Sequence, residues 1–405
     1  MVFAVGVVLF ALGIAVSIAL HEFGHLLIAK AFGMKVRRYF IGFGPRIFSF
    51  RRGETEYGLK AVPAGGFCDI AGMTALDELE PDELDRAMYR QSAWKRIAVM
   101  LGGPISHFII GILLIYILAV SYGLPNLNPT TTATVGKVSC AAPTQDQQGK
   151  YADCAGLGPA EQAGLQPGDV ITHVNGKATP TFVDVVRETQ AARGATDFTI
   201  TRDGQELHKT IQVQPVQRYL VEPGNPTPRE AQVGAIGVAP TSNAPVQYNA
   251  LSAIPGSVAF TGTMVEKTWE SLLRFPEKVP AVVRAIGGEP RGADTPISVV
   301  GASVIGGQVA ERGLWEVFLL LLASLNLFIG MFNLLPLLPL DGGHMAVTLY
   351  EKVRDVVRRS MGKAQGAPVD YTKLLPLTYL VLLIGGGVTL LTVVADVVNP
   401  IQLFP

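Results

Sequence analysis

The sequence predicts a polytopic α-helical membrane protein with four transmembrane helices, on three observations. The 405-residue chain is 49% hydrophobic and only 16% charged, whereas soluble domains are about a quarter charged. Its mean hydropathy is positive, at +0.34. Its apolar residues gather in four segments, each long enough for a bilayer crossing of about 20 residues, at 2–30, 97–121, 314–335 and 374–398.

The first apolar segment is expected to be a retained helix. A secretory signal peptide is the alternative, because it too is an N-terminal apolar run. A signal peptide begins with basic residues, however, and no Lys or Arg precedes Lys30. Basic and acidic residues both total 33, so the composition indicates no nucleic-acid partner.

Basic residues in the connecting segments predict the orientation of the helices. Residues 30–96 hold 12 Lys and Arg and the connector 345–373 holds six, while the much longer segment 122–313 holds 15. Short loops rich in Lys and Arg stay on the cytoplasmic side of the membrane. We therefore expect both short connectors in the cytoplasm, and both termini and segment 122–313 outside.

Two shorter patterns lie in the first connector. Residues 37–73 alternate apolar and polar side chains between Gly and Pro residues, which is typical of β-hairpins. The acidic stretch 76–90 is expected to form an amphipathic surface helix that leads into the second transmembrane helix.

The outer segment contains a predicted α+β domain. Residues 158–213 show a short helix, a strand at 169–174, an Asn-Gly turn, a helix near 181–192 and a hairpin across 202–204. This order resembles a circularly permuted bacterial PDZ domain, which binds an extended chain end or peptide at a sheet edge. A small β domain without a ligand is the alternative.

The rest of the outer segment is less informative. Residues 241–313 have helical spacing with Pro interruptions and predict amphipathic helices, either on the outer membrane face or packed on the PDZ-like domain. Cys140 and Cys154 lie in the outward segment, where disulfides persist. We expect them to be bonded, with two free thiols as the alternative, and Cys68 to be reduced.

Two histidines and a glutamate interrupt the first transmembrane helix, in the sequence HEFGH at 21–25. Four residues of helix bring His21 and His25 to one face, where both can bind zinc beside Glu22 as general base. Ionisable groups at membrane depth are usually functional. The alternative is that both histidines bond to the backbone of neighbouring helices.

A catalytic zinc needs a third protein ligand and an open position. Asp341 follows an apolar stretch broken by two prolines, between the third and fourth apolar segments. Counted along both helices at about 1.5 Å per residue, Asp341 and the two histidines reach one level, towards the cytoplasmic side. Asp341 is therefore the predicted third ligand, and an ordinary turn aspartate is the alternative.

These motifs together resemble the site-2 protease family, and within it the bacterial regulator-of-sigma-E-type intramembrane zinc metalloproteases. Besides HEFGH and the PDZ-like segment, the pattern N-x-x-P-x-x-P-x-D-G at 333–342 is similar to the family's. Residues 41–67 resemble its membrane-re-entrant β-loop, and GGPISHF at 102–108 its second-helix motif. The implied organisation is 1–121 with helices 1–2, 130–240 PDZ domain, 241–313 amphipathic region and 314–405 with helices 3–4.

The resemblance also implies roles for individual residues. His21, His25 and Asp341 would hold one Zn²⁺, with Glu22 as catalytic base. Asn333 would hold substrate backbone, and the substrate strand would pair near Gly65, Gly66 and Phe67. The implied substrates are single-span proteins of the bacterial plasma membrane, anti-sigma factors already trimmed by another protease.

The chain departs from the family pattern at a few positions. His107 stands where Asn is common, Cys68-Asp69 replaces a Val-Lys pair, and the two prolines of 333–342 are spaced one residue wider than in some members. None of these changes removes an expected ligand. A helix-interior hydrogen bond is expected for His107 and an interfacial position for His344, rather than metal binding.

Two other classes of protein fit parts of the sequence. A PDZ-bearing membrane adaptor with an inactive protease core would bind no zinc. A metal transporter would show His or acidic residues along several helices, whereas a single compact cluster is present here. The zinc metalloendopeptidase is the prediction that accounts for all of the motifs.

Overall fold

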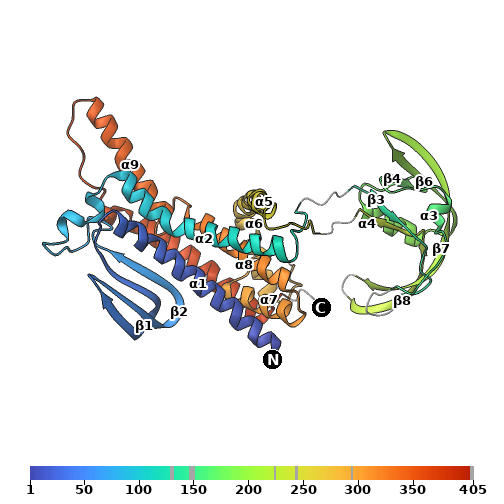
Figure 1. Cartoon of the computed structure of the whole chain (residues 1–405), viewed down its shortest axis with the longest axis horizontal. Helices are drawn as coiled ribbons and strands as arrows, with labels where there is room; N and C mark the ends of the chain where they lie inside the picture. The colour runs from blue at the N-terminus through green and yellow to red at the C-terminus, as the bar shows by residue number, and fades with distance from the viewer. Residues whose placement is uncertain (128–131, 146–150, 223–224, 242–244, 293–294, 402–405) are drawn as a thin grey trace. The chain divides into compact units, whose positions relative to one another are not determined.

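A computed structural model divides the chain into two compact units, Met1–Leu124 with Gln247–Phe404, and Pro125–Val246 (Figure 1). The structure describes all residues except 128–131, 146–150, 223–224, 242–244, 293–294 and 402–405, and only the backbone of 63–64, 220–222 and 225–228.

The first unit contains the long apolar helices. Four helical segments in the described residues are long and apolar enough to cross a membrane: Val2–Ala31, Ala93–Ser121, Trp315–Asn333 and Tyr371–Val398. They are α1 (Val2–Ala31), α2 (Ala93–Ser121), α8 (Trp315–Asn333) and, after the 3₁₀ turn η3 (Tyr371–Leu374), α10 (Leu375–Val398). The predicted polytopic helical membrane protein is confirmed.

Glycines let α1 approach its neighbours closely. A Cβ on Gly102 of α2 would lie 2.6 Å from the backbone oxygen of Gly24 on α1, so neither helix tolerates a side chain at this crossing. A third helix, α7 (Val299–Glu311), meets the N-terminal half of α1, where Gly306 packs on the ring of Phe10. Close backbone approach of this kind is typical of helices packed in membranes.

A long β-hairpin lies beside α1, made of β1 (Val36–Arg52) and β2 (Thr55–Ile70). The backbone of Arg38 has Glu56 as its strand partner on one side and Asp69 on the other, because each strand folds back along the other. Residues 66–70 therefore have a neighbouring strand on one side only. The Tyr39 hydroxyl donates to the Ala19 carbonyl of α1 at 2.7 Å, which fixes the hairpin to the helix.

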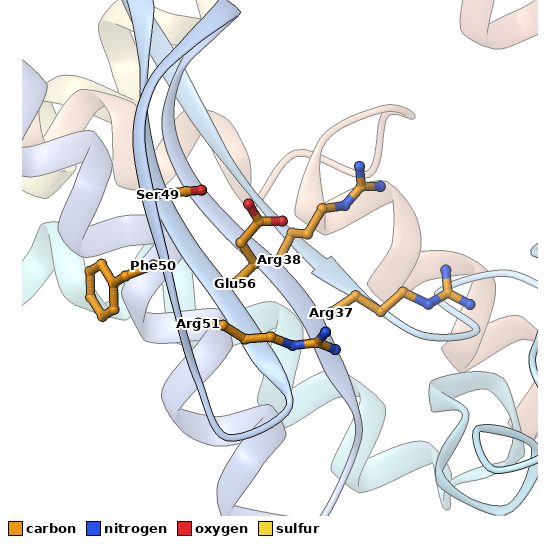
Figure 2. A pocket seen from close by; sticks show the side chains of 6 residues that line it. All are labelled: Arg37, Arg38, Ser49, Phe50, Arg51 and Glu56. Atoms are coloured by element: carbon orange, nitrogen blue, oxygen red, sulfur yellow. The ribbon is translucent and has the colours of Figure 1, made fainter.

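Three arginine side chains gather on one side of the hairpin sheet. Figure 2 shows Phe50 on one side of the strands and Arg37, Arg38 and Arg51 on the other. The arginines line a pocket of about 440 Å³. Arg37 pairs with Glu83 and Arg38 with Asp69, so most of this positive charge is neutralised within the protein.

The acidic stretch 76–90 is not the predicted amphipathic helix. It forms turns and two single 3₁₀ turns, η1 (Leu84–Arg86) and η2 (Met88–Arg90). Its carboxylates instead pair with cations at the base of the hairpin, where Lys35 meets Asp82 and Arg37 meets Glu83. The Arg37 guanidinium lowers the pKa of Glu83 to about 2.

The helices of residues 253–311 belong to the first unit. They are α5 (Ala253–Leu273), α6 (Phe275–Ile286) and α7. α5 packs on α2 and α8, and α6 packs on α10. The predicted helices are thus present, and they pack on the long apolar helices.

The second unit is β-rich. A five-stranded sheet has the order β5-β4-β6-β7-β8, and a separate pair joins β3 to β9. Two helices, α3 and α4, complete the unit. The elements are β3 (Val135–Val138), α3 (Pro159–Gln162), β4 (Val170–Val174), β5 (Lys177–Ala178), α4 (Phe182–Ala191), β6 (Gly194–Arg202), β7 (Gln205–Glu222), β8 (Asn225–Ala235) and β9 (Val238–Pro240).

Local sequence signals in this unit are confirmed. The Asn-Gly turn joins β4 to β5, with a left-handed φ of 48° at Asn175. The helix predicted near 181–192 is α4, which Thr181 and Asp184 begin with a reciprocal capping box. Cys140 and Cys154 form a disulfide, and Cys68 is free.

Candidate active site

The site begins with two imidazoles on one face of α1. His21 and His25 are both buried, at 8% and 6% exposure, because this face of α1 packs against α2. Their Nε2 atoms lie 3.1 Å apart. The helical spacing of four residues therefore brings both rings together, as the sequence predicts.

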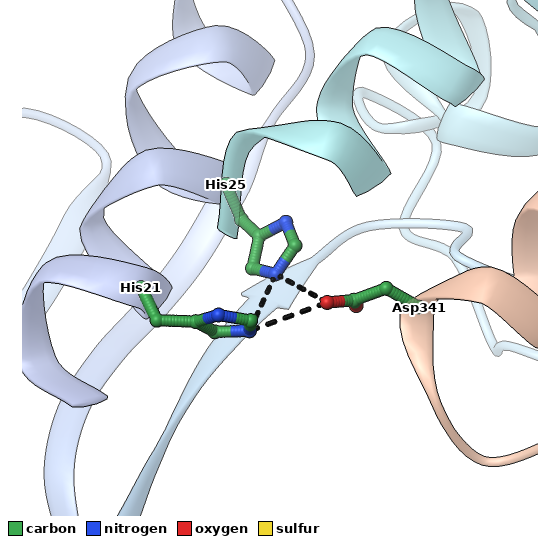
Figure 3. A group of neighbouring side chains, drawn as sticks. All are labelled: His21, His25 and Asp341. Atoms are coloured by element: carbon green, nitrogen blue, oxygen red, sulfur yellow. Dashed lines mark hydrogen bonds and ion pairs between the residues drawn. The ribbon is translucent and has the colours of Figure 1, made fainter. Parts of the chain in front are cut away.

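The third member of the cluster comes from the far end of the chain. α8 ends at Asn333, and residues 334–340 turn back to the first residue of α9 (Asp341–Ser360). Asp341 Oδ2 lies 3.2 Å from His21 Nε2 and 3.4 Å from His25 Nε2 (Figure 3). The ligand atoms of these three residues all lie within 4.8 Å of one another.

The dimensions and the donor set of the cluster fit a zinc ion. Zinc bonds of about 2.0–2.2 Å in a tetrahedron set neighbouring ligand atoms about 3.3–3.6 Å apart, close to the observed triangle. His21 Nδ1 and Asp341 Oδ2 are buried without a hydrogen-bond partner among the described residues. Buried polar atoms rarely lack a hydrogen-bond partner. A cation bound between the three side chains would satisfy the Asp341 oxygen.

A backbone carbonyl fixes the orientation of one imidazole. His25 Nδ1 lies 2.7 Å from the carbonyl oxygen of Val99 on α2. Because a carbonyl only accepts, Nδ1 carries the proton and Nε2 presents its lone pair to the centre of the cluster. Metal-binding histidines usually have such an outer partner.

The backbone of α2 forms the wall behind both rings. A Cβ at Gly103 would lie 2.6 Å from His21 Nε2 and would also contact His25 Nε2. The space next to the two nitrogens is thus available only because residue 103 has no side chain.

A buried ion pair holds α9 against α2. Arg96 Nη1 lies 2.6 Å from Glu351 Oε2, and the other Glu351 oxygen accepts from the backbone N–H of Val369 at 2.7 Å. These contacts fix α9 about ten residues beyond Asp341, and so fix the position from which Asp341 enters the site.

Glu22 faces the hairpin. A Cβ at Gly66 would lie 3.1 Å from Glu22 Cγ. The edge segment 66–70 therefore runs next to Glu22. Of the predicted strand residues, Gly66 lies next to Glu22, whereas the Phe67 ring stacks on Phe40 and Gly65 packs on Phe43.

Asn333 is the last residue of α8 and half-buried. Among the described residues no partner is found for its side-chain amide. His344, three residues beyond Asp341, stacks on Tyr371 and lies 3.2 Å from its hydroxyl.

One hydrogen-bonded polar pair next to the site was predicted only in part. His107 of α2 bonds to Asn326 of α8 at 3.0 Å, and its ring lies 5.0 Å from that of His21. The interior hydrogen bond of His107 was expected, but Asn326 was not singled out. An Asn in the middle of an apolar helix was the available signal, because such a group needs a buried partner.

Comparison with known proteins shows the family to which the chain belongs. The model of "Peptidase family M50" matches residues 9–376 of this chain. The chain is 50% identical to "Zinc metalloprotease Rip1" of Mycobacterium bovis over 404 residues, which is 100% of both chains. It is 48% identical to the protein of that name from Mycolicibacterium smegmatis, over 100% of both, and 29% identical to "Metalloprotease MmpA" of Caulobacter vibrioides, over 88% of this chain and 89% of that one.

Proposed function

The chain belongs to peptidase family M50 and is a multi-pass membrane zinc metalloendopeptidase, and from this premise we propose that it hydrolyses peptide bonds within transmembrane segments of single-span proteins. The observation that carries the proposal is the triangle of His21, His25 and Asp341, with edges of 3.1–3.4 Å. This triangle lies between helices long enough to cross a membrane.

We propose that His21, His25 and Asp341 would hold the zinc ion and that Glu22 is the general base. Bound there, zinc would supply Lewis acidity for the attack of water on a peptide carbonyl. The Glu22 carboxylate takes a proton from the attacking water and gives it to the leaving amine. Asn333 has an uncommitted amide, whose Nδ2 donates to a backbone oxygen of the substrate.

The substrate must be unwound before it can be cut, because a transmembrane helix uses its own carbonyls in internal hydrogen bonds. We propose that segment 66–70 captures the unwound chain by edge pairing, within a membrane-re-entrant hairpin. The segment has a free edge and runs next to Glu22. Deleting Gly65–Phe67 should impair cleavage while zinc stays bound, and normal turnover in that variant would exclude strand capture.

The β-rich unit is proposed to be an extracytoplasmic PDZ domain that gates access. It would favour single-span proteins whose outer domain has been trimmed, anti-sigma factors among them, by binding a new C-terminus or by excluding bulky domains. In this topology both termini lie outside and the site lies towards the cytoplasm. Removing residues 135–213 should abolish discrimination between trimmed and intact substrates, and unchanged discrimination would contradict gating.

The experiment that tests the proposal is cleavage of a tagged single-span substrate by the purified full chain, for wild type and Glu22→Ala, with zinc content measured on both. Cleavage lost in Glu22→Ala with zinc retained would support Glu22 as base. No zinc in the purified chain and no difference in cleavage between the two proteins would contradict the proposal.

A further inference from the structure

The two faces of segment 66–70 have different neighbours. Gly66 faces α1, because a Cβ there would lie 3.1 Å from Glu22 Cγ. Successive side chains of a strand point to opposite faces, so Phe67 points away from Glu22. On that second face the ring of Phe67 stacks on the ring of Phe40, with 5.6 Å between their centroids.

A second pocket of the hairpin, of about 290 Å³, opens on this face. Its lining includes the two rings and three cations, Arg38, Arg46 and Lys60. The Lys60 ammonium lies 4.7 Å from the centroid of the Phe67 ring and 5.3 Å from that of Phe40. Cation–π contacts of this length hold an ammonium in place. They leave its charge uncompensated, because both rings are neutral.

Two of the three cations already have a carboxylate partner. Arg38 lies 2.7 Å from Asp69, and Arg46 lies 3.1 Å from Glu56. For Lys60 no carboxylate partner is found among the described residues. Lys60 is also half-buried, so a carboxylate placed beside it would be attracted more strongly than at an open surface.

A substrate strand that pairs with the free edge of segment 66–70 would present side chains to both faces in turn. Those that face α1 would lie next to Glu22. Their neighbours in the substrate would lie beside Phe67, because directly opposed residues in a sheet have Cβ atoms about 4.5–5.5 Å apart. An acidic side chain at such a position can extend along the Phe67 ring towards the Lys60 ammonium.

We propose that Lys60 is a specificity-determining residue, which selects an acidic side chain of the substrate close to the bond that is cut. This inference rests on the proposed function, because it takes segment 66–70 as the edge that captures the substrate. An Asp or Glu of the substrate pairs with Lys60, and the Phe67 ring covers its methylene groups. A Lys or Arg at the same position meets a pocket with an uncompensated positive charge and is rejected.

Binding to the purified full-chain variant Glu22→Ala tests the pocket apart from catalysis. The probes are synthetic single-span helices with a fluorescent label, each with Glu or Lys placed in turn at successive positions of its apolar segment. Fluorescence anisotropy in micelles of a neutral detergent measures their affinity. At one or more positions the Glu helix should bind about tenfold or more tightly than the Lys helix, because like charges at an interface are costly.

Substitutions of Lys60, made in the same background, assign the preference to this side chain. Lys60→Glu should reverse it, and Lys60→Gln, which keeps much of the side-chain length, should abolish it. Arg52→Glu is the matched control, because Arg52 is exposed in the same hairpin and does not line the pocket. This variant should keep the preference of the parent chain, and zinc content should be equal in all variants.

Four outcomes would overturn the role of Lys60. They are no binding by any helix, no charge preference at any position, a preference that Lys60→Glu leaves unchanged, and an effect of Lys60 seen only after phosphatidylglycerol is added. The last would mean that the pocket binds a lipid phosphate. Wild type is offered the same helices for cleavage. Cleavage without charge-selective binding would retain the peptidase and reject the pocket, whereas charge-selective binding without cleavage would do the reverse.

Discussion

Asp341 and Asp169 are both carboxylates with a buried oxygen, yet their surroundings differ. Asp169, in the β-rich unit, is bound in a bidentate ion pair to Arg202 at 2.6 and 2.8 Å and accepts from the backbone N–H of Gln166. Asp341 faces two imidazole nitrogens and has an oxygen without a hydrogen-bond partner among the described residues. The protein itself satisfies the Asp169 carboxylate, whereas the Asp341 oxygen remains available to bind a cation together with the two imidazoles.

The largest effect is expected from removing a member of the unsatisfied cluster. His25→Ala or Asp341→Asn should lower zinc affinity by more than the about 10- to 100-fold typical of outer partners. The first removes an imidazole nitrogen from the triangle, and the second replaces a charged carboxylate by a neutral amide. Zinc content of the purified chain measures this. Asp169→Asn is the matched control and should retain zinc; zinc bound normally by both site variants would contradict the assignment.

The next largest effect is expected from Gly103→Ala. The new Cβ would contact the Nε2 atoms of His21 and His25, so we expect zinc content to fall about tenfold or more, in line with loss of outer-shell support. Gly386→Ala in α10, where a Cβ meets nothing within 4 Å, is the control. Equal zinc in both variants would mean that α2 shifts to accommodate the methyl group.

The disulfide should matter to the β-rich unit alone. Cys140 and Cys154 are 14 residues apart, and closing a loop of this length stabilises by about 3 kcal/mol. Replacing both with Ala should lower the unfolding temperature of this unit and leave zinc content unchanged. Calorimetry of the full chain measures the unfolding temperature. An unfolding transition of the double variant at the wild-type temperature would contradict this prediction.

Acid should produce the smallest effect, again in the β-rich unit. Burial alone raises the pKa of Asp169, but the Arg202 guanidinium and the Gln166 N–H lower it below its ordinary value. The ion pair therefore contributes stability above the ordinary carboxyl pKa of about 3.9, and this contribution is lost as the pH falls through the lowered pKa. Asp169→Asn should flatten that part of the pH profile, and an unchanged profile would exclude the ion pair as its cause.

Sequence reasoning was most accurate where the signal is local. Three correct predictions each depend on one continuous stretch of the sequence. They are the membrane-spanning helices, the pairing of His21 with His25 and the turn at Asn175. Asp341 was found through its motif, although 316 residues separate it from His25 in the printed sequence. The stretch 76–90 was misread because its acidic residues follow a helical pattern, while their partners, Lys35 and Arg37, lie in another element.

The closest supports of the site were beyond prediction for a related reason. Gly103 and Val99 act through contacts between helices whose relative rotation no sequence pattern fixes. Asn326 could be recognised as a polar residue within an apolar helix, but its pairing with His107 could not. The same holds for the double pairing of Arg38 in the hairpin, because a strand that bends back on itself has no local signature.

X-ray absorption at the zinc edge of the purified full chain tests the central claim most directly. A zinc ion held by His21, His25 and Asp341 should show only nitrogen and oxygen neighbours, with the scattering of two imidazoles, and one imidazole fewer in His25→Ala. Sulfur in the first shell would indicate Cys68 or another cysteine as a ligand. That result, or a spectrum unchanged by His25→Ala, would contradict the account.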